Sequence, residues 1–244
     1  MLFFFCIIVG TAMAEEVKVG AGAAPVENIF ERIKVPMEKE IGLSLILNPS
    51  GPVQALKDLD AGLIDAAAGG ISFQEWIGMM EKDNYSIKDK NVYRHQAIGK
   101  DVVKVIIHKE IRIPQLSKDQ LTGIFTGKTK NWSDVGGPNL PIIVVTGTKI
   151  PGTLKVFQSQ IMNQAGYTDQ ALESTTAEEM KKKVISTPGA VCLGTMSAVD
   201  DTIQAPDIPV VWRPITLITK GEPAGSVKKM IDYIKGDGQR YILK

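Results

Sequence analysis

The chain has 244 residues, of which 44% are hydrophobic and 23% are charged, and its formal net charge is +1. This length and composition fit a globular protein with one large or two smaller cores, and they exclude a disordered or fibrous chain. The near-neutral charge provides no overall field toward nucleic acid or a membrane surface, so any selectivity for charge has to come from a local site.

The first fourteen residues, MLFFFCIIVGTAMA, carry no charge and end in the small-x-small pattern Ala12-Met13-Ala14. This apolar run is too short to span a bilayer comfortably, so we predict a signal peptide at 1–14 and a soluble, exported, periplasmic product. The basic residues that usually open such a segment are absent, and a buried N-terminal strand is the alternative. Cleavage would leave Cys192 as the remaining cysteine, predicted to be a buried structural thiol.

From Val17 onward the chain alternates strand-like and helical patterns. Ser72 and Ser117 are predicted helix N-caps, and a Thr-x-x-Glu capping box opens the helix after residue 175. Gly62 and Gly127 follow helices that they are expected to end. The predicted strands are 17–22, 63–70, 101–109, 142–145 and 190–195, with a strand and loop at 43–52 and a strand and turn at 210–223. The predicted helices are 26–42, 53–62, 71–83, 116–127, one from about 151, 175–190 and 226–242.

This alternation predicts an α/β fold with mostly parallel sheets flanked by helices. Turn-rich segments at 84–101 and 197–210 divide the chain into three parts. The middle part has its own set of strands and helices, which favours two lobes connected by two crossings.

Four strand-to-helix loops are rich in glycine or proline: GAGAAP, NPSGP, AAAGGIS and TGTKIPGT. Ligands of open parallel sheets bind beyond the carboxyl ends of the strands, where helix N-termini offer free N–H groups to an anion. The pattern therefore predicts a site for a small charged ligand. Plain connections are the alternative, because glycine-rich turns of this kind are common in α/β proteins.

Signs of catalysis are few in this sequence. GAGAAP lacks the third glycine of a dinucleotide loop, and no GxxxxGK[ST] motif is present. His95 and His108 are far apart and lack the spacing of metal ligands. We therefore expect no enzyme activity, no cofactor and no metal site.

Several segments resemble the phosphate-binding proteins of phosphate ABC transporters, which are type II periplasmic substrate-binding proteins. GAGAAP, VVKVIIHK, the run LSKDQLTGIFTGKTKNWSDVGGPNLPIIVV, the following PGT, RPITLITKG and GDGQRYI occur in the family's order, and the run 116–145 is the most specific. The resemblance implies two α/β lobes joined by a two-strand hinge, with the ligand enclosed in a cleft between them. It places lobe 1 at 15–101 plus 200–244, including Arg213-Pro214, and lobe 2 at 102–199.

The resemblance also implies a ligand-binding set, but four of the family's side chains are replaced. Ala24 stands for a threonine, Gly70 for an aspartate, Gly147 for an arginine and Pro151 for a serine. Each lost hydrogen bond to a charged group costs roughly 1.5–3 kcal/mol, so affinity for phosphate is expected to be weakened. The candidate residues are Ala23, Ala24, Ser50, Gly51, Gly70, Ile71, Ser72, Thr148, Lys149, Gly152 and Thr153.

Two hypotheses follow from the resemblance. In the first, a monomeric exported protein captures phosphate, a related oxyanion or a small organic acid between its lobes and delivers it to the membrane permease of an ABC importer. In the second, a sensor or accessory protein keeps the fold and has lost tight phosphate binding.

Overall fold

The computed structural model describes residues 15–147 and 151–242. The predicted signal peptide at 1–14, together with Thr148 and Lys149, lies outside these residues. Among the described residues, no helix is long and apolar enough to cross a bilayer.

The described residues form one sheet of nine strands with helices packed on it. The strands are β1 Glu15–Ala21, β2 Leu43–Pro49, β3 Ala66–Gly69, β4 Tyr93–His108, β5 Ile143–Gly147, β6 Leu172–Ser174, β7 Ala190–Thr195, β8 Ile203–Gln204 and β9 Val211–Lys220. The α-helices are α1 Ala23–Pro25, α2 Glu31–Ile41, α3 Pro52–Asp60, α4 Phe73–Lys82, α5 Lys118–Phe125, α6 Pro151–Gln160, α7 Ala177–Ser186 and α8 Gly225–Lys235. Short turns are the π-helical η1 Val26–Phe30 and the 3₁₀ turns η2 Lys90–Val92, η3 Trp132–Val135, η4 Met196–Ala198 and η5 Asp237–Arg240.

The strand order is β2-β1-β3-β9-β4-β7-β5-β6, with β8 paired to β4. The predicted α/β class is confirmed. Parallel pairing holds for β1 with β2 and β3, and for β5 with β6 and β7, whereas β4 and β9 pair antiparallel with each other and with their other neighbours. The prediction of mostly parallel pairing therefore fits only the outer strands, because the two crossing strands run in opposite directions.

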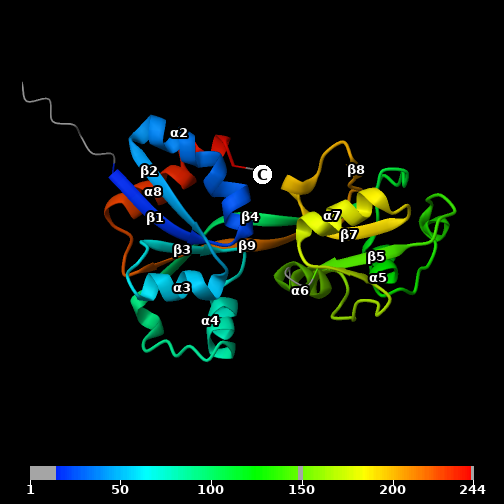
Figure 1. Ribbon diagram of the computed structural model, residues 1–244, viewed down its shortest axis with the longest axis horizontal. Coiled ribbons are helices and arrows are strands. Elements are labelled where there is room, and N and C mark those ends of the chain that lie inside the picture. The colour runs from blue at the N-terminus through cyan, green and yellow to red at the C-terminus, as the bar shows by residue number, and fades with distance from the viewer. Residues whose placement is uncertain (1–14, 148–150, 243–244) are drawn as a thin grey trace, which may run out of the picture.

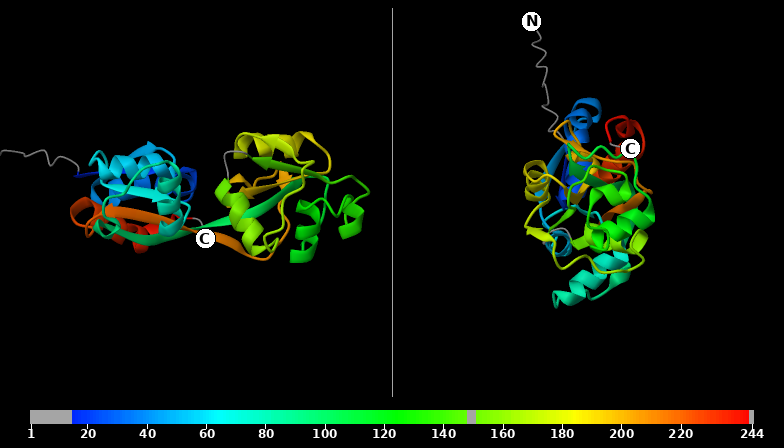
Figure 2. Two further views of the ribbon diagram at one scale, coloured as in Figure 1. Left: turned by 90° about the horizontal axis from the view of Figure 1, so that it is seen from below. Right: turned by 90° about the vertical axis from the view of Figure 1, so that its right-hand side faces the viewer.

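The sheet is divided into two lobes, which only β4 and β9 span (Figure 1). We call the part built on β1–β3 with α2, α3, α4 and α8 lobe 1, and the part built on β5–β7 with α5, α6 and α7 lobe 2. Figure 2 shows the same two bodies from below, with β4 and β9 running between them. Each lobe has apolar clusters of its own: Ile98 and Ile215 belong to lobe 1, and Val103 and Val211 to lobe 2.

Local sequence signals explain the helix ends. Ser72 and Ser117 are N-caps, as predicted, and the predicted capping box of the helix after residue 175 forms at Thr176. In the structure all three residues accept a hydrogen bond from the third helical N–H and complete a capping box. Gly127 follows α5 with a φ of +74°, a left-handed conformation that glycine adopts without strain. The prediction of a turn-rich segment over 84–101 is wrong beyond residue 92, because β4 begins at Tyr93 and pairs with β9 along its whole first half.

The predicted lobe boundaries, 101/102 and 199/200, stay a prediction. Ile203 and Val211 pack in the cores of lobe 2. From this packing we propose that β9 crosses from lobe 2 to lobe 1 at Trp212–Pro214, and that the residues just after 199 belong to lobe 2.

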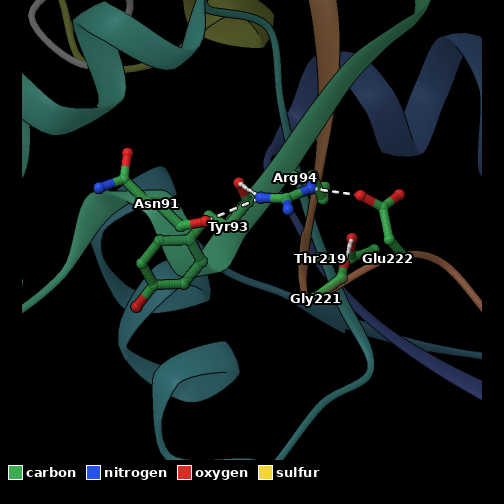
Figure 3. Close-up of polar contacts among 6 residues, drawn as sticks. All are labelled: Asn91, Tyr93, Arg94, Thr219, Gly221 and Glu222. Atoms are coloured by element: carbon green, nitrogen blue, oxygen red, sulfur yellow. Dashed lines mark hydrogen bonds and ion pairs between the residues drawn. The ribbon is translucent and has the colours of Figure 1, made fainter.

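The end of β4 and β9 farthest from lobe 2 is fastened by exposed polar contacts (Figure 3). The Arg94 guanidinium pairs with Glu222 through Nε and donates from Nη1 to the carbonyl oxygens of Asn91 and Tyr93. Thr219 Oγ1 donates to the carbonyl of Gly221 at 2.8 Å. Because the Arg94 and Glu222 side chains are about half and three-quarters exposed, this ion pair contributes little to stability.

A second polar cluster attaches the C-terminal segment to α2. The Glu40 carboxylate accepts hydrogen bonds from Tyr241 Oη at 2.7 Å, Arg240 Nη2 at 2.6 Å and Tyr233 Oη at 2.9 Å. These donors favour the ionised form and lower the pKa of Glu40 from its ordinary 4.5 to about 2.

Acid is therefore expected to weaken the fold between about pH 4.5 and pH 2. The unfolded chain binds a proton at Glu40 near its ordinary pKa, whereas the folded chain resists protonation down to about pH 2, so stability falls as pH falls through this window. In Glu40→Gln, thermal unfolding at pH 2–6 should show a shallower dependence on pH. Some slope should remain, since the pKa values of Asp60 and Asp200 are also lowered to about 2. The exposed Glu38→Gln is the control, and equal slopes in the two variants would contradict the prediction.

Candidate functional site

The two strands that join the lobes carry opposite charges at the crossing. In the antiparallel register of β4 and β9, Asp101 lies opposite Arg213. The Asp101 carboxylate is fully buried, and its Oδ2 accepts from Arg213 Nε and contacts Nη2, both at 2.7 Å. Its other oxygen accepts from Asn28 Nδ2 at 3.0 Å. Both oxygens of this buried carboxylate thus accept from a donor, as a buried charge requires.

The Arg213 guanidinium lies between the third and fourth candidate loops. A Cβ atom on Gly70 would be 3.2 Å from Arg213 Nε, and a Cβ on Gly152 would be 2.6 Å from Nη1. Any larger residue at either position would press on the guanidinium, so these two glycines leave the space that it fills. With Nε and Nη2 held by Asp101, Nη1 is the nitrogen left without a protein acceptor among the described residues.

A cavity of about 240 Å³ opens beside Arg213 between the lobes. Gly152, Val156 and Gln160, spaced four residues apart on α6, all line it, so the cavity runs along one face of that helix. It is lined by Gly70, Ile71, Glu75, Gly152, Val156, Gln160, Trp212, Arg213 and Pro214. Gly152 is in the first turn of α6, a helix of ten residues, so the positive end of that helix dipole faces the same space as the arginine.

The Glu75 carboxylate brings a negative charge to the cavity wall. It accepts hydrogen bonds from the Ser72 hydroxyl at 2.8 Å and the Ser72 N–H at 3.0 Å within the capping box of α4. Burial by itself raises the pKa of Glu75, but the Ser72 bonds and the charges of Lys155 and Arg213 outweigh it and lower the pKa below its ordinary value. Glu75 is therefore ionised at neutral pH.

Trp212 and Gln160 line the cavity together. Gln160 Nε2 donates to the Trp212 carbonyl at 2.9 Å, and its Oε1 accepts from the Trp212 N–H at 3.3 Å, which ties the end of α6 to the crossing strand. Trp212 as a residue is 39% exposed, and its ring lies under the ammonium of Lys100, which is 4.6 Å from the ring centroid.

Three of the residues proposed from sequence line this cavity: Gly70, Ile71 and Gly152. Ala24 is buried and lies against Gly70, where an added Cβ would be 3.1 Å away. The rest of the described candidates do not line it: Ala23 is exposed at the start of α1, Gly51 is the N-cap of α3, Ser72 is the N-cap of α4, Ser50 precedes α3 and Thr153 is buried in α6.

Ser50 adds a donor near these loops. Its N–H donates to the Ala21 carbonyl at 2.9 Å, which holds the second loop against the first. Its hydroxyl is buried and has no hydrogen-bond partner among the described residues. A buried hydroxyl without a partner is uncommon and costs free energy, so this atom is a further candidate for a ligand or water contact.

Sequence reasoning missed Arg213, Glu75 and Trp212 as site residues. The available signal was a pair of opposite charges beside apolar runs: Asp101 directly precedes VV at 102–103, and Arg213 precedes PITLI. Because they are 112 positions apart, only the register of β4 with β9 brings them together. The cation that Gly147 does not supply in the fourth loop is therefore present in the cleft, on the crossing strand.

The comparison with known families supports this architecture. The family described as PBP superfamily domain matches residues 9–237. The chain belongs to the PBP superfamily. The match spans both lobes and both crossing strands.

Individual relatives add detail. The phosphate-binding protein PstS of Bacillus subtilis is 30% identical over 146 residues, which are 54% of this chain and 48% of that protein. The chain thus spans about half the length of this relative. A putative phosphate ABC transporter substrate-binding protein from Clostridium perfringens, solved with bound phosphate, has a TM-score of 0.72 at 21% identity and covers 94% of this chain and 99% of its own.

The same fold occurs outside transport. The reduced OxyR regulatory domain from Pseudomonas aeruginosa has a TM-score of 0.62 at 13% identity, covering 91% of this chain and 95% of that domain. Identities this low show a shared fold alone. The function of the chain therefore has to be argued from its own cleft.

Proposed function

We propose that this chain is an exported solute-binding protein that captures a small anion between its lobes and delivers it to an ABC importer. The observation that carries the proposal is the position of the Arg213 guanidinium, which lies in the cleft between Gly70 and Gly152 with Nη1 beside the cavity. Arginine is well suited to oxyanions because its planar donors fit carboxylate and phosphate geometry. The relatives named as phosphate-binding proteins support an anion as the ligand class.

Transport requires that the lobes close on the ligand and that the closed form docks on a permease. The geometry supports this mechanism, since the ligand-facing arginine belongs to a strand that joins the lobes. We propose a periplasmic, monomeric protein with no catalytic role, in line with the sequence prediction.

A sensor or accessory role is the second candidate, and one observation favours it. Asp101 neutralises Arg213, and Glu75 adds a carboxylate to the cavity, so the cleft offers less net positive charge than a tight site for a dianion needs. In that case the lobes would respond to a weakly bound ligand without supplying an importer.

Anion binding should depend on Arg213. In thermal-shift and calorimetric titrations with phosphate, sulfate, molybdate and small carboxylates, at least one anion should stabilise the protein saturably, because a ligand that binds only the folded state raises its stability. Arg213→Gln should weaken that anion roughly 10- to 150-fold, the equivalent of a charged hydrogen bond of about 1.5–3 kcal/mol. Arg94→Gln, on the same pair of strands but far from the cleft, is the control.

The outcomes separate the hypotheses. If no anion stabilises the chain at millimolar concentration, anion capture is wrong. If an anion binds but its uptake is the same in cells with and without the gene, the sensor role replaces transport.

A further inference from the structure

We propose that the ligand of the cleft is a small organic monocarboxylate whose head group binds beside Arg213 Nη1 and whose apolar body lies along Val156 and Trp212. This inference rests on the proposed function, since it names the ligand class of the same site. Three features of the cavity carry it: its wall, its size and its charge.

The wall of the cavity is mostly apolar away from Arg213. Ile71, Val156, Trp212 and Pro214 form much of the lining. An inorganic oxyanion presents oxygen atoms on every side and loses water bonds wherever it meets carbon, and this loss is costly. A molecule with one charged end and an apolar body matches such a wall, because its body gains from leaving water.

The size of the cavity also exceeds what one oxyanion needs. Its volume of about 240 Å³ lies just below the range of roughly 300–1,000 Å³ that is usual for drug-sized ligands. An ion of five heavy atoms would occupy only one end of it. The cavity extends from Gly152 along α6 to Gln160 and Trp212, which leaves room for a short apolar chain or ring beyond the head group.

The charge around the cavity fits a monoanion. Among the described residues, the cations are Arg213 in the lining, Lys155 acting on Glu75, and Lys100 over the Trp212 ring. The carboxylates of Asp101 and Glu75 offset two of them, which leaves one positive charge unbalanced. One carboxylate neutralises this charge, whereas the second charge of a dianion would face Glu75 without a compensating cation from the described part of the chain.

The geometry of Arg213 points in the same direction. Its Nε and Nη2 are engaged by Asp101, so a ligand meets the guanidinium through the Nη1 side alone. The first turn of α6 at Gly152 adds backbone donors and a partial positive charge next to that nitrogen. Together they can hold the two oxygens of one carboxylate, and the apolar body then follows α6.

The test is a calorimetric series on the full chain with acetate, butyrate, hexanoate and benzoate, beside inorganic phosphate and sulfate. Affinity should rise about fourfold for each methylene buried, until the cavity is full. Benzoate or hexanoate should bind more tightly than phosphate and sulfate. This series uses the unmodified protein, so it does not depend on a variant that folds poorly.

Two matched variants locate the ligand. Val156→Asn, in the cavity wall, should remove most of the gain from acetate to hexanoate and leave acetate binding nearly unchanged. Val227→Asn, half-buried on α8 and away from the cleft, should keep the full gain.

Each contrary result has a distinct meaning. If phosphate or sulfate binds more tightly than every carboxylate and this binding requires Arg213, the carboxylate inference is wrong and anion capture stands. The inference is also wrong if affinity does not rise from acetate to hexanoate, or if this rise persists in Val156→Asn. If no anion binds, both the inference and the proposed function fail.

Discussion

Replacing Asp101 with alanine is expected to lower the free energy of unfolding by about 3–5 kcal/mol, the usual cost of removing one partner from a buried ion pair. Asp101 is fully buried and accepts from Arg213 and Asn28. Without it, the guanidinium stays in a site where only 17% of its side chain is exposed, and within the described ranges no other carboxylate forms an ion pair with it. For a protein of this size, the loss corresponds to a fall in melting temperature of roughly 6–20 °C.

The matched control is Glu222→Ala, which breaks the exposed ion pair between Arg94 on β4 and Glu222 just after β9. Exposed pairs contribute about 0.2–1 kcal/mol, so this variant should unfold almost like the unmodified protein. Urea titration of both variants measures the difference. If Asp101→Ala and Glu222→Ala lower the free energy of unfolding equally, the Asp101–Arg213 pair does not have the energetics of a buried ion pair.

The double variant Asp101→Ala/Arg213→Met distinguishes two causes of the stability loss in Asp101→Ala: the unpaired charge of Arg213 and the lost packing of Asp101. Removing both charges should recover a large part of the stability that Asp101→Ala loses, since apolar replacements of buried pairs are often close to neutral. A double variant as unstable as the sum of the two single variants would mean that the residues act independently. If the double variant regains stability but does not bind the anion, Arg213 contacts the ligand, and Asp101 acts by pairing with Arg213.

Much of the fold was predictable from local signals. The capping boxes at Ser72, Ser117 and Thr176 and the stop at Gly127 follow from short-range chemistry, which a sequence displays directly. The first half of β4 was not predictable in this way, because YRHQAIGK is polar and has no run of apolar residues. This segment is a strand because it pairs with β9, and this long-range pairing outweighs its weak local strand propensity.

The candidate site also combines residues that local sequence predicts with residues that only the tertiary structure reveals. Gly70 and Gly152 were predicted as loop residues that face a ligand, and both line the cavity. In the sequence, Gly70 stands where the family has an aspartate, which suggests a lost ligand contact. In the structure, the absence of a side chain at Gly70 leaves space for the Arg213 guanidinium. A sequence shows which side chain is absent from a position, but it does not show which distant side chain fills the space.

Gly152→Ala is expected to weaken anion binding roughly 10- to 150-fold, as much as losing the Arg213 contact itself. The added Cβ would lie 2.6 Å from Nη1, closer than real carbon and nitrogen atoms approach. Because Asp101 holds the other side of the guanidinium, Arg213 cannot move away without stretching its bonds to Oδ2. Forcing extra volume into such a packed site also costs about 1–3 kcal/mol of stability.

Gly51→Ala is the control in the second loop. Gly51 has a φ of −70°, and an added Cβ would meet no atom within 4 Å, so this alanine is accommodated without movement. It should change stability by less than about 1 kcal/mol, the scale of an altered N-cap. Anion affinity in this variant should stay within a factor of about two or three of the unmodified chain, since differences of a few tenths of a kcal/mol are expected away from the cation.

A cycle with Arg213→Gln decides how Gly152→Ala acts. If the alanine works by displacing the guanidinium, it should have little further effect on affinity once Arg213 is glutamine, and the two changes should be strongly non-additive. If the methyl group instead blocks the ligand directly, its effect should persist in the Arg213→Gln background. Additive effects, measured by calorimetry with the anion that binds best, would thus contradict the view that Gly152 is glycine in order to make room for Arg213.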